Sequence, residues 1–361
     1  MSNIIDYLSW RGDVTFDYSP FNEVDALILS QLVYFDFSRA VKSGFTKKGS
    51  TLKEASDSLC TKTLLETDPT CRLLNKAGYS RRFGSLRLSG YVSKLDFENE
   101  EQFCAMTFSD RNVNYVAFRG TDNTLVGWKE DFNMGYMDTV PAQGDALKYL
   151  TEAVEELKDS FVVMGHSKGG NLAIFSSAKV PSKIKKHITA VFNNDGPGFK
   201  PGFFNSAEYQ EIASIDNTFV PELSLVGMLF EHAPDFIVIK SDEKVMIKQH
   251  DPFGWQTEAV QFVRAKERGG QSHFADDTIN KWFNEMTEEQ RVTFIETLFE
   301  ILNGSEAKTN AELTADWFNS SKKMLKTINR LDPKTKDTVI KTVNLLVKNA
   351  IENSGDLINK K

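Results

Sequence analysis

The 361-residue sequence predicts an α/β fold, in which a mainly parallel sheet is flanked by helices and further helices are added at both ends. Strand-like and helical segments alternate through the middle of the chain, as in parallel sheets with crossover helices. Residues 161–164 (FVVM) and 188–192 (ITAVF) are short apolar runs, as expected for strands buried on both faces. A glycine-rich turn follows the first of these runs directly, where a strand would pass into a helix.

The first part of the chain predicts helices and then strands. Residues 21–40 carry apolar side chains at helical intervals, and residues 51–77 predict short helices broken at Pro69. Three strands rich in Val, Tyr and Phe are expected next, at residues 86–97, 102–108 and 114–118.

The middle of the chain supplies the alternating elements. Helices are expected at residues 142–158, just after Pro141, and at 171–180. Two further strands are predicted after the strand at 188–192, at residues 235–240 and 244–248.

After about Thr278 the sequence predicts helices only, with Lys-rich amphipathic segments at residues 311–331 and 334–357. We therefore expect a catalytic domain over residues 1–300, including a helical N-terminal part at 1–84, and a helical appendage at 301–361. A solvated surface is the expected role of the basic faces, and contact with acidic lipid or a partner is the alternative.

The composition limits the kinds of partner and the cellular location that can be expected. A net charge of −7 gives no support for nucleic-acid binding. The N-terminus lacks the basic start and apolar run of a signal peptide, and no stretch reaches the ~18 apolar residues that span a bilayer. Cys60, Cys71 and Cys104 have no metal-type spacing and are expected to be buried thiols in a reducing compartment. The expectation is a cytoplasmic protein whose oligomeric state stays open.

The strongest motif is the run GHSKGGN at residues 165–171, which fits G-x-S-x-G. This pattern puts a serine on a sharp turn between a strand and a helix, where small neighbours are needed because the backbone folds back on itself. Ser167 is then the nucleophile of an α/β-hydrolase fold, and the N–H of Lys168 can stabilise an oxyanion. The Lys168 side chain is expected to point to solvent, with attraction of an anionic substrate group as the alternative.

A second oxyanion donor is expected from the loop after the strand at 114–118, which reads Arg119-Gly120-Thr121-Asp122. Thr121 offers both a backbone N–H and a hydroxyl. An ordinary turn at the end of a strand is the other interpretation of this loop.

These two motifs resemble the class 3 (fungal-type) lipases, which carry an FRGT loop and a GHSLGG elbow in the same order. Lys168 departs from that pattern, since an apolar residue is common there in lipases. A longer ordered set of motifs, including NNDGPGF and QHDPFGWQ, resembles the Mbeg-like family of bacterial proteins over roughly residues 3–300. The resemblance implies an α/β-hydrolase fold and a Ser–Asp–His triad.

The base must be one of five histidines, and in this fold it follows the serine and the acid along the chain. His250 comes after a predicted late strand and matches the QHDP motif of the resembled family. His232 and His273 are alternatives. His166 is expected to point away from the serine, and His187 to lie at the opposite edge of the sheet.

The acid is predicted to be Asp195, which ends the strand after the elbow helix and precedes a tight Gly-Pro-Gly turn. Asp216 corresponds better to the acid position of the fungal lipases, and Asp235 is a third candidate. A turn aspartate that caps its own backbone is the structural alternative for Asp195.

The apolar segment at residues 220–230 is either a lid or acyl-chain wall, or ordinary core. Substrate contacts are expected from four apolar residues: Leu225, Met228, Phe230 and Trp255. The sequence thus predicts a serine hydrolase that cleaves carboxylic, lipid-like esters without a metal or organic cofactor. Peripheral membrane contact is compatible with this prediction. A catalytically inactive hydrolase fold that binds a ligand or partner is the alternative.

Overall fold

The computed structural model describes residues 2–42, 44–121, 125–135, 137–224, 226–244, 246–266, 285–287 and 289–293, together with Pro333 and Asp337. Apart from those last two residues, the predicted appendage at 301–361 lies outside the described part of the chain, as does the histidine candidate His273.

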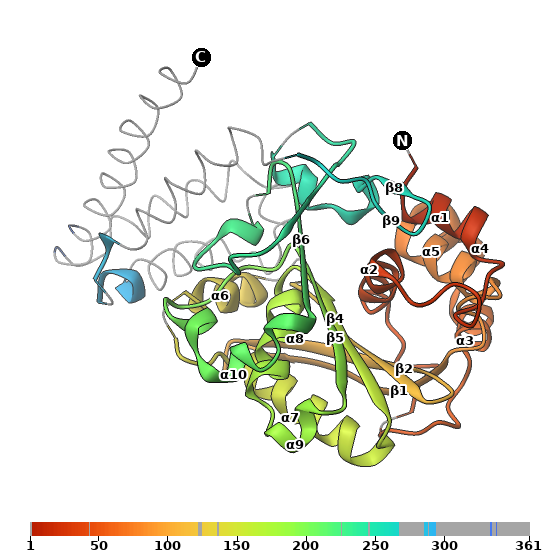
Figure 1. Cartoon of the computed structure of the whole chain (residues 1–361), viewed down its shortest axis with the longest axis horizontal. Helices are drawn as coiled ribbons and strands as arrows, with labels where there is room; N and C mark the ends of the chain where they lie inside the picture. The colour runs from red at the N-terminus through yellow and green to blue at the C-terminus, as the bar shows by residue number, and fades with distance from the viewer. Residues whose placement is uncertain are drawn as a thin grey trace.

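In the described part, seven strands form one sheet whose spatial order follows the sequence, from β1 to β7 (Figure 1). The first three strands pair in antiparallel fashion, and β3 to β7 are parallel. The strands are β1 Arg87–Asp96, β2 Glu101–Asp110, β3 Val113–Phe118, β4 Ser160–His166, β5 Ile188–Asn194, β6 Asp216–Pro221 and β7 Ile237–Ile239. A separate short pair consists of β8 Thr257–Glu258 and β9 Gln261–Phe262.

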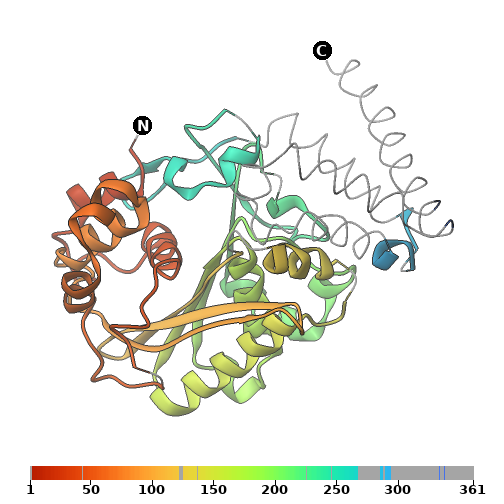
Figure 2. The ribbon, with the colours of Figure 1, turned by 180° about the vertical axis from the view of Figure 1, so that it is seen from behind.

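Helices cover both faces of the sheet, so the protein has three layers (Figure 2). The N-terminal helices lie on one face, and α7 and α8 lie on the other. The helices are α1 Ile4–Arg11, α2 Glu23–Leu32, α3 Leu52–Leu59, α4 Lys62–Thr67, α5 Pro69–Gly78, α6 Leu125–Asn133, α7 Pro141–Leu157, α8 Lys168–Lys179, α9 Ser182–Lys185 and α10 Ala207–Gln210. This architecture is the predicted α/β-hydrolase fold.

The apolar side chains of the central strands pack into two hydrophobic cores, one on each face of the sheet. Tyr115 and Ala117 of β3 face the core under the N-terminal helices, whereas Val116 and Phe118 face the core under α7 and α8. Strand β4 alternates in the same way. Side chains on a strand point to opposite faces in turn, so a strand covered on both sides is apolar throughout.

The strand predicted at residues 244–248 is wrong. Residues Met246–His250 form a 3₁₀ turn (η4), although the sequence at 245–247 is the apolar run VMI, which is typical of a strand. Gln249 explains the turn, because its side-chain amide donates to the Glu243 carbonyl at 2.7 Å and its amide oxygen accepts the Leu223 N–H at 2.8 Å. These two bonds fold the segment back toward the sheet.

Among the elements that were not predicted, strand β6 and helix α6 lie near the site described below. Strand β6 begins with three polar residues, DNT, and therefore lacks the apolar run that marks the other parallel strands. Helix α6 follows directly on a polar loop and has no strong periodicity in its nine residues, LVGWKEDFN. Both elements contribute to the site described below.

A buried ion pair connects α2 to the turn that leads into β1. The Arg82 guanidinium donates to both carboxylate oxygens of Asp25, and neither side chain has exposed surface. The same guanidinium donates to the carbonyls of Val14, Ser19 and Pro20. One side chain thus holds α2, the loop before it and the turn that leads into β1.

Candidate active site

The carboxyl ends of three neighbouring strands meet at one edge of the sheet. Phe118 of β3 pairs with Gly165 of β4, and Asn194 of β5 pairs with His166 of β4. Ser167 and Asp195 are the residues that directly follow β4 and β5. Parallel pairing therefore brings these two candidate residues side by side, as it does for the sites of other parallel sheets.

Ser167 occupies the sharp turn that the motif predicts. Its backbone has φ 58° and ψ −135°, a conformation that costs energy for a residue with a side chain, and α8 begins at the next residue. A Cβ on Gly165 would lie 2.1 Å from the carbonyl of Gly169, so the turn requires glycine there. The Ser167 N–H donates to the Asn194 carbonyl at 3.0 Å, which ties the turn to β5.

His250 and Asp195 form a hydrogen-bonded pair. Nδ1 of His250 lies 2.7 Å from Oδ2 of Asp195; the carboxylate is fully buried, and the imidazole is 22% exposed. The Ser224 hydroxyl donates to the other carboxylate oxygen at 2.5 Å. Because a carboxylate only accepts, Nδ1 of His250 carries a hydrogen, and in the neutral form of the ring the lone pair is on Nε2.

His166, next to the serine, fastens the loop that carries His250. Its Nε2 lies 2.9 Å from the His250 carbonyl and must donate there, so its Nδ1 accepts from the Tyr34 hydroxyl at 3.3 Å. The centroids of the His166 and His250 rings are 4.6 Å apart. Burial and the neighbouring His250 lower the pKa of His166 well below its usual value, so its ring is neutral. Apart from the presence of a histidine in the elbow, no pattern in the sequence indicates this contact.

The loop after β3 packs against Ser167. A Cβ on Gly120 would lie 2.8 Å from the Ser167 Cβ and 2.6 Å from the His166 carbonyl, so the loop approaches the elbow closely. The Thr121 hydroxyl donates to the carboxylate of Asp131 in α6. Burial raises the pKa of Asp131 to about 6, against the opposing effects of Lys168 and the Thr121 hydrogen bond.

The prediction that the Lys168 side chain points to solvent is wrong. This side chain has no exposed surface, and its Nζ bonds to Glu130 Oε2 at 2.8 Å and to the Gln102 carbonyl at 2.7 Å. Glu130 belongs to α6, the helix that the sequence did not predict. The counter-charge that makes burial of the lysine tolerable was therefore not visible in the sequence.

The other candidate acids lie elsewhere. Asp216 is the first residue of β6, where it pairs with Val191 in the middle of β5, and it accepts from the Tyr209 hydroxyl at 2.9 Å. Asp235 is exposed in the turn before β7. Neither residue is positioned to orient His250.

Two other histidines have contacts to backbone carbonyls. His187 precedes β5 and bonds through Nδ1 to the Asp159 carbonyl at 2.9 Å, at the opposite edge as expected. Nδ1 of His232 lies 3.5 Å from the Phe230 carbonyl.

The environment of Asp216 predicts a pH dependence of stability. Burial raises the pKa of this carboxyl from 3.8 to about 6. The folded protein therefore binds a proton between about pH 4 and 6 that the unfolded chain has released, so this group makes stability fall as pH rises through that range. In thermal melts from pH 4 to 7, Asp216→Asn should show a smaller decline than the wild type. Equal declines would contradict the shift.

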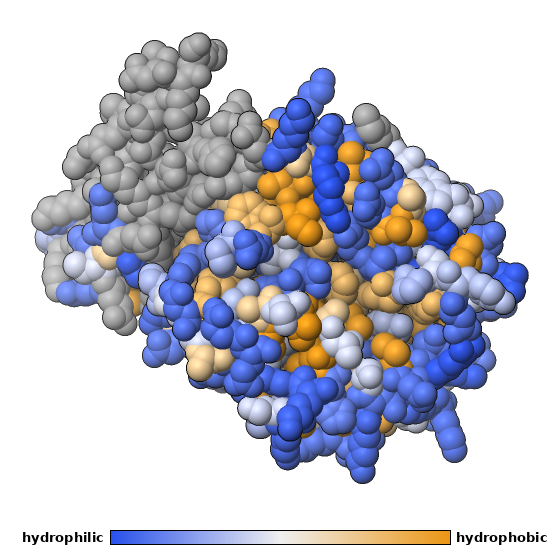
Figure 3. Space-filling view, viewed as in Figure 1, coloured by the Kyte–Doolittle hydropathy of each residue, from blue (hydrophilic) through white to orange (hydrophobic). Residues whose placement is uncertain are grey.

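Of the four residues expected to contact substrate, two are buried. Met228 is 1% exposed, and Trp255 is fully buried and donates from its indole N–H to the Gln249 carbonyl at 2.8 Å. Phe230 is half-buried with φ 66°, and Leu225 lies outside the described residues. On the face shown in Figure 3, several hydrophobic patches lie among hydrophilic residues.

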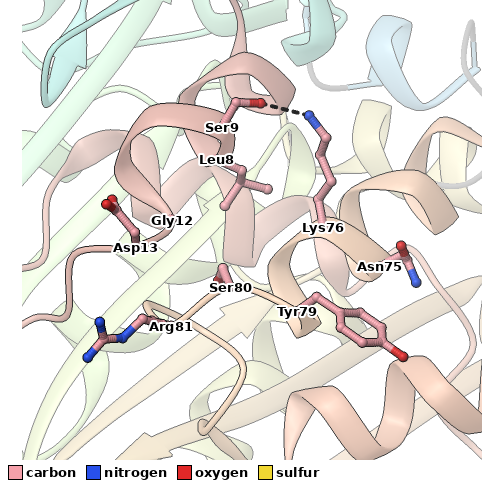
Figure 4. A pocket seen from close by; sticks show the side chains of 9 residues that line it. All are labelled: Leu8, Ser9, Gly12, Asp13, Asn75, Lys76, Tyr79, Ser80 and Arg81. Atoms are coloured by element: carbon pink, nitrogen blue, oxygen red, sulfur yellow. Dashed lines mark hydrogen bonds between the residues drawn. The ribbon is translucent and has the colours of Figure 1, made fainter.

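A hollow of about 370 Å³ lies between α1, α5 and the turn after α5, and contains none of the candidate site residues. Figure 4 shows Lys76 there, with its Nζ on the Ser9 hydroxyl at 2.9 Å.

Within the described ranges, no cluster of three or more His, Cys, Asp or Glu side chains is arranged to hold a metal ion. No helix in that part of the chain has the length and apolar character needed to cross a bilayer.

Residues 77–300, more than half of the chain, match the Mbeg1-like family. No curated protein matches the sequence. Among solved structures, a native Rhizomucor miehei lipase–propeptide complex is similar at TM-score 0.33 and 18% identity, over 43% of this chain and 57% of that chain. The M37 lipase is similar at TM-score 0.36 and 14% identity, over 57% of this chain and 68% of that one. These similarities are too weak to carry function from the lipases to this chain.

Proposed function

This chain belongs to the Mbeg1-like family, and from its site geometry we propose that it is a serine hydrolase that cleaves carboxylic esters. Ser167 is the nucleophile, His250 the general base and Asp195 the residue that orients the base. The observation that carries the proposal is the buried Asp195 carboxylate, 2.7 Å from Nδ1 of His250, in a loop fastened to the residue beside a strained Ser167. A nucleophile, a base and an orienting group are the three parts that acyl transfer by serine requires.

The reaction follows from these positions. Nε2 of His250 takes the Ser167 proton as the hydroxyl oxygen attacks the ester carbonyl, and Asp195 stabilises the imidazolium that forms. The N–H groups of Lys168 and Thr121 donate to the oxyanion. The imidazolium then gives its proton to the leaving alcohol, and water, activated by the same histidine, hydrolyses the acyl-enzyme.

For the substrate we propose an ester with an apolar acyl group. The supporting feature is the apolar segment at residues 220–230, which begins at the end of β6. Ser224 in this segment bonds to the carboxylate of Asp195, so the segment lies beside the candidate acid. Phe230 is its half-buried aromatic residue. A p-nitrophenyl ester series should show a rise in kcat/KM with acyl length up to an optimum, because each buried methylene is worth about 0.8 kcal/mol. A flat series would exclude an apolar acyl pocket.

The nucleophile and base are tested with a fluorophosphonate probe. Wild-type protein should label, Ser167→Ala should not, and His250→Ala should label at least about 10³-fold more slowly because the serine loses its base. His187→Ala is the matched control, because this histidine bonds to backbone at the opposite edge of the sheet. It should label at the wild-type rate.

A folded wild-type protein that fails to label would favour the inactive, ligand-binding alternative. Labelling that persists in Ser167→Ala would move the nucleophile to another residue.

A further inference from the structure

Glu130 joins four elements at a point directly behind the elbow. Its Oε1 accepts the Ala142 N–H at 2.8 Å, at the start of α7. Its Oε2 accepts the Gln102 N–H of β2 at 3.1 Å and bonds to Lys168 Nζ at 2.8 Å. Both charged side chains of this pair have no exposed surface.

The pair also connects the two candidate oxyanion donors. Lys168 supplies one N–H from its own backbone, and its side chain ends on Glu130. The next residue of α6, Asp131, accepts from the hydroxyl of Thr121, which supplies the other donor. The two donors are therefore connected through α6, by the side-chain contacts of Glu130 and of Asp131 and by the backbone that joins these two residues.

Stability alone gives little reason for charges at this place. Burying an ion pair removes two charges from water, and apolar residues of similar volume are often as stabilising or more so. Oxyanion donors, by contrast, must be placed within a few tenths of an ångström of the developing charge to be effective.

We propose that Lys168 and Glu130 are positioning residues for the oxyanion site. Their ion pair holds α6, and with it Asp131 and Thr121, at a set distance from the Lys168 N–H. The inference rests on the proposed function, since it assigns a role within that same site. It predicts that loss of the pair impairs the chemical step more than substrate binding.

The test compares Lys168→Met and Glu130→Gln with the wild type on a p-nitrophenyl ester, with active sites counted by phosphonate labelling. Each variant keeps the backbone N–H of residue 168. We expect kcat per active site to fall by about 10²- to 10³-fold, the size of losing one oxyanion donor, with KM changed less than about threefold. The double variant should be no worse than the poorer single variant, because the two residues act as one unit.

The control is another fully buried ion pair. Asp25→Asn weakens the Arg82–Asp25 pair, which lies at the start of α2 and is equally unexposed. If buried pairs matter here only for stability, both sets of variants should lower the melting temperature and leave kcat per active site unchanged. We expect that result for Asp25→Asn alone.

Lys168→Arg and Glu130→Asp keep the charges but change the length of the contact, so they remain informative should the neutral variants not fold. The positioning role requires a lower kcat in these two variants as well. Wild-type kcat per active site in every folded Lys168 and Glu130 variant would overturn the inference while leaving the proposed function intact. Wild-type protein that neither labels nor hydrolyses esters would overturn both.

Discussion

Asp195→Asn is expected to lower kcat about 10⁴-fold while the protein stays folded. The surroundings of Asp195 explain why an isosteric change should have so large an effect. The Ser224 hydroxyl donates to one oxygen of the side chain, so an asparagine would keep its carbonyl there and turn its NH₂ toward His250. The imidazole would then accept at Nδ1 and carry its hydrogen on Nε2, where it cannot take the proton of Ser167.

This prediction is checked by ester hydrolysis, with Asp216→Asn as the matched control. Both aspartates follow or begin neighbouring parallel strands, and both accept a hydroxyl hydrogen bond from within the protein. Asp216→Asn should keep wild-type kcat. The opposite outcome, in which Asp216→Asn is inactive and Asp195→Asn is not, would assign the acid to β6.

Asp25→Ala is expected to reduce the free energy of unfolding by about 3–5 kcal/mol, because it leaves the Arg82 guanidinium buried without its counter-charge. Three backbone carbonyls still accept from Arg82, but they carry no charge. Urea unfolding followed by circular dichroism measures the loss.

Asp17→Ala is the comparison for this second prediction. Asp17 receives two hydrogen bonds from Arg111, at 2.7 and 2.8 Å, but the two side chains are 53% and 70% exposed. Water screens such a pair, so its loss should have a far smaller effect. Similar losses in the two variants would show that Arg82 gains nothing from the charge of Asp25.

The sequence predicted most of the layers because their patterns are local. A buried parallel strand such as β4 is a short apolar run, and the elbow that follows it is a compact motif. Strand β6 and helix α6 were not predicted because neither has an apolar periodicity of its own. Their places are decided by contacts with elements far away in the chain.

The same distinction applies to the site. Ser167 and Asp195 each follow a predicted strand, so their proximity could be predicted from parallel pairing. The burial of Lys168 could not be predicted, because its partner Glu130 lies 38 residues earlier in the chain. Nor could the sequence indicate that Ser224, in an apolar segment, would bond to the carboxylate of Asp195.

The contact between His166 and the His250 carbonyl holds His250 at the elbow directly, and not only through the connection that leads to it from β7. Two contacts hold the loop that carries His250. His166 bonds to the His250 carbonyl at the elbow, and Gln249 accepts the Leu223 N–H, so the end of β7 is not the loop's sole attachment. The position of the His250 imidazole is therefore held at the elbow, at the Leu223 N–H and at the Glu243 carbonyl, so a shift of the short strand β7 is opposed by these contacts before it reaches the ring.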